Sequence, residues 1–164
     1  MSKAKISALI VLLVVGLAIS ALPAPGVSAG REAKLMAGAA KVIITPTVNE
    51  EDPYEDPVWI GGWDIRIAVG IHDELYARSV VVRSKGTTLA IVAVDLIGLF
   101  YADVREIRTM VNPSLGIDHI IVASTHNHEG PDTMGLWGPH PFISGVDPEY
   151  MMFVKEQVVS CIET

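Results

Sequence analysis

Hydrophobic and polar positions along the chain predict four strands. Short runs of β-branched or mainly apolar residues, bounded by Gly, Pro or charged residues, are typical of strands. The four runs are Lys41–Thr45, Tyr76–Arg83, Thr87–Leu96 and His119–Ala123. Lys85-Gly86 predicts a hairpin between the middle two. Because Thr87–Leu96 is apolar at nearly every position, we expect it to be buried on both faces.

Two further segments carry the helical period. In Tyr101–Val111, apolar residues recur along one stripe, and Asn112-Pro113 is expected to end that helix. Asp147 is the predicted N-cap of a second helix, with Pro148 in its first turn. The alternation of strands and helices predicts an α/β fold, a layered domain of sheet and helix.

The second helical pattern continues to the last residue. Its apolar face has five members: Met152, Val154, Val158, Val159 and Ile162. No glycine, proline or basic last turn follows them, although such residues commonly end a helix. This pattern predicts a truncated chain, in which residues 30–164 are the N-terminal part of a larger domain. The alternative is a short protein whose last helix frays.

The first 29 residues have the composition of a secretory signal. Lys3 and Lys5 supply its positive start, Ile6–Leu22 is free of charged residues, and the small residues Val27-Ser28-Ala29 predict a cleavage site. We therefore expect a secreted or extracytoplasmic protein. An uncleaved segment that anchors the protein in the membrane is the alternative.

Charge and cysteine content narrow the class of protein. Cleavage after Ala29 leaves 135 residues and, by removing Lys3 and Lys5, takes the formal net charge from −7 to −9. A chain this acidic has no basic stripe for phosphate backbones, which argues against nucleic acid as a partner. Cys161 is the only cysteine, so no internal disulfide is expected and Cys161 is interpreted as a small apolar residue of the last helix.

The strongest chemical candidate follows the last predicted strand, in STHNHEGPDTMGLWG, residues 124–138. If the extended conformation persists through Asn127, His126 and His128 point to one side. Two imidazoles aimed at one point favour zinc, although a catalytic zinc usually takes three protein ligands. The pair therefore indicates either an incomplete metal site or a solvated polar turn. Glu129 or Asp132 could add a ligand, or accept a hydrogen bond that fixes an imidazole tautomer.

Other polar residues are weaker candidates. Asp95 ends an apolar strand and is interpreted as a structural hydrogen-bond acceptor, with membership of the site as the alternative. His72 and Asp73 could form a hydrogen-bonded pair or cap a strand. His119 is expected at the surface, and His140 is expected in a loop between Pro139 and Pro141. The sequence has no G-x-S-x-G elbow, no phosphate-binding glycine loop and no H-E-x-x-H motif.

Four segments together resemble a known family. In order they are AGAAKVIITP (37–46), GIHDELYARSVVV (70–82), AIVAVDLIGL (90–99) and STHNHEGPDTMGLWG (124–138). The same blocks occur in this order at the beginning of the N-terminal catalytic domain of neutral/alkaline non-lysosomal ceramidases. The resemblance runs from about Met36 to Trp137. It implies an α/β domain that holds zinc and hydrolyses ceramide to sphingosine and a fatty acid.

The resemblance also implies roles for individual residues. The family signature is His-Thr-His-Ser-Gly-Pro, so His126 would bind zinc and His128 would lie near the scissile amide. Asn127 and Glu129 depart from the signature, and Glu129 adds a negative charge beside the metal. The family's remaining zinc ligands and its proposed catalytic serine come from later in its chain, so the site formed by these 164 residues would be incomplete.

The resulting hypothesis is an exported, zinc-dependent amidohydrolase, of which this fragment would be inactive alone. Its substrate would be ceramide or a related N-acyl lipid, reached through peripheral contact with a membrane surface. Two alternatives remain. One is a non-catalytic exported module, and the other is a metal hydrolase for a different amide or ester, which Glu129 makes plausible.

Overall fold

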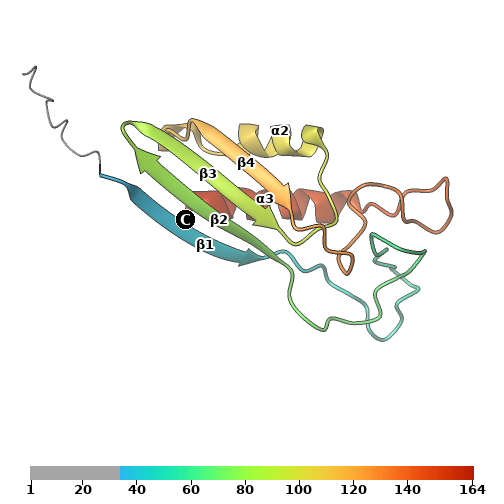
Figure 1. Cartoon of the computed structure of the whole chain (residues 1–164). Coiled ribbons are helices and arrows are strands. Elements are labelled where there is room, and N and C mark those ends of the chain that lie inside the picture. The colour runs from blue at the N-terminus through green and yellow to red at the C-terminus, as the bar shows by residue number, and fades with distance from the viewer. Residues whose placement is uncertain (1–33) are drawn as a thin grey trace, which may run out of the picture. The chain divides into compact units, whose positions relative to one another are not determined.

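A four-stranded mixed sheet organises residues 34–164, the part of the chain that the computed structural model describes (Figure 1). The strands are β1 (Met36–Ile43), β2 (Tyr76–Ser84), β3 (Thr87–Val94) and β4 (His119–Ser124), in spatial order β1-β2-β3-β4. β2 pairs antiparallel with β1 and with β3, whereas β3 and β4 are parallel. The α/β prediction is confirmed.

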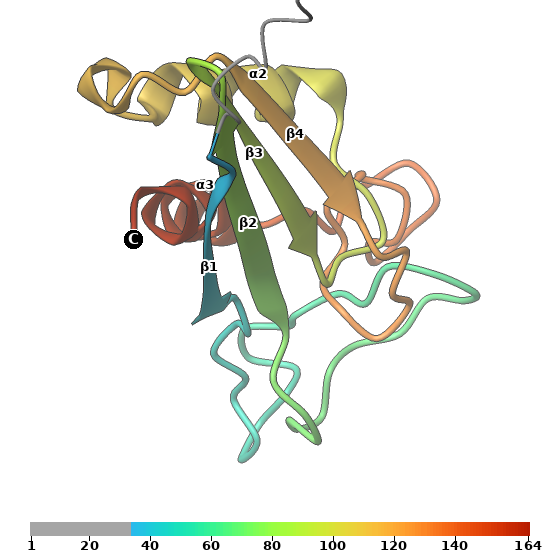
Figure 2. The same cartoon turned by 60° about the vertical axis from the view of Figure 1, so that its left-hand side comes forward.

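Both helices cover the same face of this sheet (Figures 1 and 2). α2 (Tyr101–Met110) connects the parallel strands, followed by a short 3₁₀ turn, η1 (Pro113–Leu115), and α3 (Pro148–Glu163) packs on β1 and β2. The predicted cap is present, because the Asp147 carboxylate accepts a hydrogen bond from the Glu149 N–H at 2.8 Å.

The core lies between the sheet and the helices. Val92 and Val94 of β3, Ile107 of α2, and Val154 and Val158 of α3 are fully buried in one cluster. Cys161 is also buried and free, and its thiol lies 3.5 Å from the Ala77 carbonyl oxygen, as expected for a small core residue. This layer fixes the positions at which β3 and β4 end.

The opposite face of the sheet is open, so the prediction that Thr87–Leu96 is buried on both faces is wrong. Val80, Ile91 and Ile121 are neighbours in register across β2, β3 and β4. Their exposed fractions are 44%, 44% and 48%. The apolar run was consistent with two covered faces, but the described residues supply a helical layer on one face only.

The hairpin prediction is confirmed, whereas the first strand is displaced. Lys85 and Gly86 have φ of 53° and 84°, the conformation that a two-residue hairpin turn requires. β1 begins at Met36, before the predicted Lys41–Thr45 run, because β2 offers backbone partners along its whole length and pairs even with Ala- and Gly-rich chain.

The predicted signal, residues 1–29, lies outside the described residues. Within residues 34–164, none of the helices combines the length and apolar character needed to cross a membrane.

Candidate functional site

The candidate site lies at the carboxyl ends of the two parallel strands. The Thr125 N–H donates to the Val94 carbonyl at 2.9 Å, and the Asn127 N–H donates to the Leu96 carbonyl at 3.2 Å. These bonds continue the β3–β4 pairing beyond the strands and bring the two following loops together. Sites of α/β proteins are usually found at this edge of the sheet.

His126 leaves the extended conformation at this edge. Its φ is +62°, so the condition of an extended conformation through Asn127 is not met; the loop turns where the sheet pairing ends. The ring Nδ1 lies 2.8 Å from the Ile97 carbonyl oxygen. A carbonyl only accepts hydrogen bonds, so Nδ1 carries the proton and Nε2 of the neutral ring keeps its lone pair.

His128 lies beside His126 despite that turn. The two ring centroids are 4.7 Å apart with the planes at 88°. On another side, the indole of Trp63 stacks on the His128 ring at 4.9 Å and 28°. The His128 Nδ1 atom is buried without a hydrogen-bond partner. The loop therefore brings the two imidazoles together by a route that strand alternation did not predict.

Arg66 holds the backbone of the same turn. Its Nη2 donates to the His128 carbonyl oxygen at 2.7 Å, and its Nη1 contacts the Glu129 carboxylate at 3.2 and 3.3 Å. Glu129 is thereby engaged in an ion pair and its side chain is 72% exposed. The described role of the Glu129 carboxylate is therefore that of an ion-pair partner for Arg66.

The segment that carries Trp63 and Arg66 is attached to the motif by backbone contacts. Ile60 forms an isolated antiparallel bridge with Pro131, and the Gly61 N–H donates to the Gly130 carbonyl at 2.9 Å. Sequence reasoning missed both side chains. The only available signal was the irregular Gly61-Gly62-Trp63-Asp64 stretch, and it does not specify which residue the indole contacts.

Asp132 has a structural role. It is 1% exposed, and its two oxygens accept hydrogen bonds from four backbone N–H groups, at 2.8 to 3.2 Å. The donors belong to Met134, Gly135, Trp137 and Gly145. With its oxygens committed to the loop, Asp132 is a loop anchor, and no imidazole is among its described hydrogen-bond partners.

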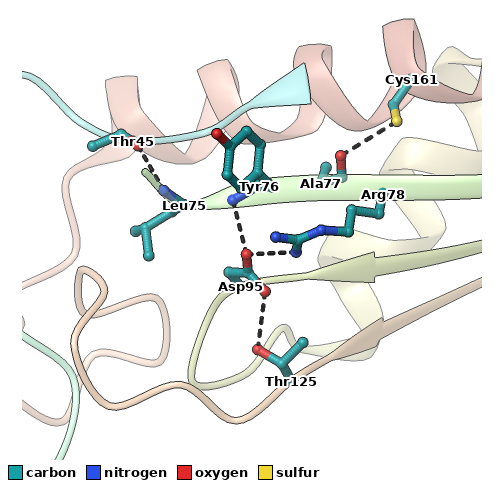
Figure 3. A network of polar contacts seen from close by, with 8 residues as sticks. All are labelled: Thr45, Leu75, Tyr76, Ala77, Arg78, Asp95, Thr125 and Cys161. Carbon is teal, nitrogen blue, oxygen red and sulfur yellow. Dashed lines mark hydrogen bonds and ion pairs between the residues drawn. The ribbon is translucent and has the colours of Figure 1, made fainter. Parts of the chain in front are cut away.

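Asp95 also has partners that fit the structural interpretation (Figure 3). Its Oδ2 accepts from the Tyr76 N–H at 3.0 Å and from Arg78 Nη1 at 2.6 Å, while Thr125 Oγ1 lies 3.4 Å from Oδ1. The carboxylate thus ties the end of β3 to the start of β2 and to the loop after β4. Only 17% of its side chain is exposed.

The remaining histidines lie at the surface. His72 and Asp73 form the predicted pair, with Nδ1 and Oδ2 2.7 Å apart, but both side chains are almost fully exposed. His119 is exposed as expected, and His140 is exposed as well. Among residues 34–164, no three His, Cys, Asp or Glu side chains gather closely enough to hold a metal ion. The described residues therefore provide a pair of imidazoles.

Strained backbone conformations also occur next to the His128 ring. In the described part of the chain, three residues other than glycine have positive φ: Trp63, Lys85 and His126. Lys85 belongs to the hairpin turn, and the other two both contact the His128 ring. Such strain tends to concentrate at functional sites.

A cleft of about 540 Å³ adjoins the motif. Arg66, Asn127 and Glu129 supply polar lining, and Ile60 and Pro131 supply apolar lining. The mixture suits a ligand that has both polar and apolar parts.

Two solved structures share this fold. The chain matches neutral ceramidase from Pseudomonas aeruginosa with a TM-score of 0.61 and 19% identity, covering 80% of this chain and 21% of that one. It matches a ceramidase complexed with C2 with a TM-score of 0.61 and 21% identity, over the same shares. No protein-family profile and no curated protein matches the chain.

Because the sequence identities are only 19% and 21%, the likeness establishes the fold alone. The chain spans about a fifth of the length of the solved ceramidases. Both neighbours are ceramidases, which agrees with the family that the four sequence segments resemble.

Proposed function

We propose that this chain supplies part of the catalytic site of a zinc-dependent hydrolase of the neutral ceramidase type. The observation that carries this proposal is the His126–His128 pair at the carboxyl ends of β3 and β4, in a fold shared with solved neutral ceramidases. Fold alone does not imply chemistry. The state of each imidazole gives the chemical support.

His126 fits a zinc ligand. Histidine ligands of zinc commonly donate their second ring N–H to a carbonyl or carboxylate, which fixes the tautomer. The Ile97 carbonyl takes that place at 2.8 Å from Nδ1, so Nε2 is the nitrogen that would hold the metal. Since a catalytic zinc usually has three protein ligands, the proposal requires further ligands beyond those that the described residues bring together.

His128 is suited to a different task. Its Nδ1 is buried and faces no acceptor, so a proton there would be an unsatisfied buried donor. The neutral ring then carries its proton on Nε2. An N–H beside the metal ligand can donate to the oxygen that gains negative charge when an amide carbonyl is attacked. A bound zinc would polarise that carbonyl and lower the pKa of attacking water.

The cleft supports an amphipathic N-acyl substrate. Arg66 and Asn127 could meet polar groups of the substrate, while Ile60 and Pro131 offer an apolar wall to a hydrocarbon chain. One of the structural neighbours is a ceramidase complexed with C2. We therefore propose cleavage of a ceramide-like N-acyl sphingolipid to sphingosine and a fatty acid. Residues 1–29 would direct export, and the protein would meet its substrate by peripheral contact with a membrane.

Substitution of His126 tests the zinc assignment. In the full chain, we expect His126→Ala to weaken zinc binding at least roughly 100-fold, because loss of even an outer partner of a ligand costs 10- to 100-fold. Calorimetric titration with zinc measures this, and His119→Ala, which removes an exposed imidazole, serves as the matched control. Equal zinc affinity in the two variants would refute the assignment.

Hydrolysis assays then identify the substrate. The assay uses zinc-loaded protein that carries the further zinc ligands required by the proposal, and offers it a short-chain fluorescent ceramide, short N-acyl amines and simple esters. Cleavage of ceramide that His126→Ala abolishes supports the proposal. Zinc binding through His126 with cleavage of only the other substrates favours a different amide or ester hydrolase. Zinc binding with no cleavage favours a non-catalytic module.

A further inference from the structure

Trp63 combines exposure with strain. The residue is 84% exposed, yet its backbone has φ +43°, a conformation that bulky residues avoid. Such a conformation is strained and persists only where the surroundings impose it. In this conformation the indole of Trp63 stacks on the His128 ring.

Gly62 closes another side of the same imidazole. Its φ is +126°, and a Cβ placed there would lie 2.0 Å from His128 Nδ1 and 2.7 Å from Cγ. The Gly62 backbone therefore packs directly against the ring edge that carries Nδ1. Because any side chain at position 62 would occupy the space of the imidazole, the absence of a Cβ is a condition for this ring position.

These contacts leave one nitrogen of His128 available. The indole covers a ring face, the Gly62 backbone covers Nδ1, and the His126 ring meets the imidazole edge to face. Arg66 fixes the His128 backbone through its carbonyl oxygen at 2.7 Å. Nε2 makes no hydrogen bond with the described residues, so it is the atom left for a ligand.

We propose that Trp63 is a positioning residue, which holds His128 against Gly62 with Nδ1 covered, so that Nε2 alone meets the substrate. The role of Nε2 toward substrate rests on the proposed function. The positioning itself does not, because it concerns the ring position in the protein alone. The experiment therefore reads the ring directly as well as through activity.

Long-range ¹H–¹⁵N correlation NMR of the histidine rings tests the positioning. Spectra of the full chain are recorded at about pH 8, where an ordinary imidazole is neutral, and His128→Gln identifies the His128 signals. We expect the wild-type ring to show a single tautomer with the proton on Nε2. Trp63→Ala should give an averaged tautomer signal, and Trp63→Phe, which keeps an aromatic face, should restore most of the fixed state.

Two pairs of variants give matched controls. Tyr54 is also aromatic, is 81% exposed and lies, like Trp63, between β1 and β2. Tyr54→Ala should therefore leave the His128 signals unchanged. Gly62→Ala should displace the ring even with Trp63 present. Gly86→Ala has a similar left-handed strain, with φ +84°, but nothing within 4 Å of the added Cβ, and should leave His128 unchanged.

Activity gives the second readout. If the protein hydrolyses a ceramide, Trp63→Ala should lower kcat roughly 100-fold with little change in KM, because misplacement of a catalytic group by about 1 Å costs that much. A fixed His128 tautomer in Trp63→Ala refutes the positioning role, whatever the activity. Averaging in Trp63→Ala, together with no hydrolysis by zinc-loaded protein that carries the further ligands, supports the positioning role and rejects the proposed function.

Discussion

The helical layer and the loops at the carboxyl ends of β3 and β4 differ in how they treat polar groups. In the layer, buried hydroxyls have partners: Ser79 donates to the Cys161 carbonyl and Tyr150 to the Ile44 carbonyl. At the loops, two buried side-chain nitrogens have none, Arg66 Nε and His128 Nδ1, and no other buried side-chain nitrogen or oxygen of residues 34–164 lacks a partner. Unpartnered groups in native structures often mark functional places.

The helical layer and the loops therefore contribute differently to the stability of the protein. The layer contributes stability through fully buried apolar residues such as Val92 and Ile107. The loops keep strained backbone at Trp63 and His126, which lowers stability unless another contact compensates. One residue of the loops departs from this pattern, because Asp132 is buried and saturated with hydrogen bonds.

Asp132→Ala should have the largest effect. It leaves four backbone N–H groups without their acceptor, and each buried unsatisfied group costs about 1–3 kcal/mol. Because water can reach part of an opened loop, we expect a loss of about 3 kcal/mol in the free energy of unfolding, measured with urea. Asp118→Ala removes a single bond, to the Thr88 N–H at the other end of the sheet, and should cost about 1 kcal/mol. Equal losses would contradict the anchoring role.

The second-largest effect is expected from alkaline pH, which should lower the stability of the helical layer. Burial raises the pKa of the Tyr150 phenol above its ordinary 10.0. For Lys155, burial acts to lower the pKa, but hydrogen bonds and charge from Glu106 and Asp103 outweigh it, so the pKa lies above 10.5. Both groups therefore keep their protons longer in the folded protein than in the unfolded chain.

The sign of the effect follows from those two shifts. Each group contributes stability that is complete below its unfolded pKa and is lost as pH rises toward its folded pKa. We expect the free energy of unfolding to fall from about pH 10 upward, by about 1 kcal/mol per pH unit for each group. Urea unfolding between pH 8 and 11 measures it, and Tyr150→Phe and Lys155→Met should each flatten the curve. Curves parallel to that of the wild type would contradict the assignment.

The layer could be predicted from the sequence because its signals are local. The Tyr101–Val111 stripe, Asn112-Pro113 and the Asp147 cap each depend on neighbouring residues, and the helices appear where they predict. Burial of Thr87–Leu96 failed for the opposite reason. Whether the second face of a strand is covered depends on chain far away in sequence, which an apolar pattern does not report.

The same distinction between local and distant signals applies to the candidate site. The His126–His128 pair was visible as a motif, but its geometry was predicted from strand alternation, and the positive φ of His126 shows that a turn brings the rings together. Trp63 and Arg66 could not be found, since their contacts with His128 span more than sixty positions of sequence. A conformation near φ +43° at a tryptophan has no sequence signal, because propensity disfavours it.

Glu129→Gln should have the smallest effect and best separates the two regions. The Arg66–Glu129 pair is solvent-exposed, at 36% and 72% of the side chains, and such pairs are worth about 0–1 kcal/mol. We expect a loss of about 0.5 kcal/mol or less in urea unfolding and zinc affinity within about twofold of the wild type, because Arg66 still holds the His128 carbonyl. A much larger loss of zinc affinity would make Glu129 a ligand and not merely the partner of Arg66. The Glu129 carboxylate would then belong to the proposed zinc site.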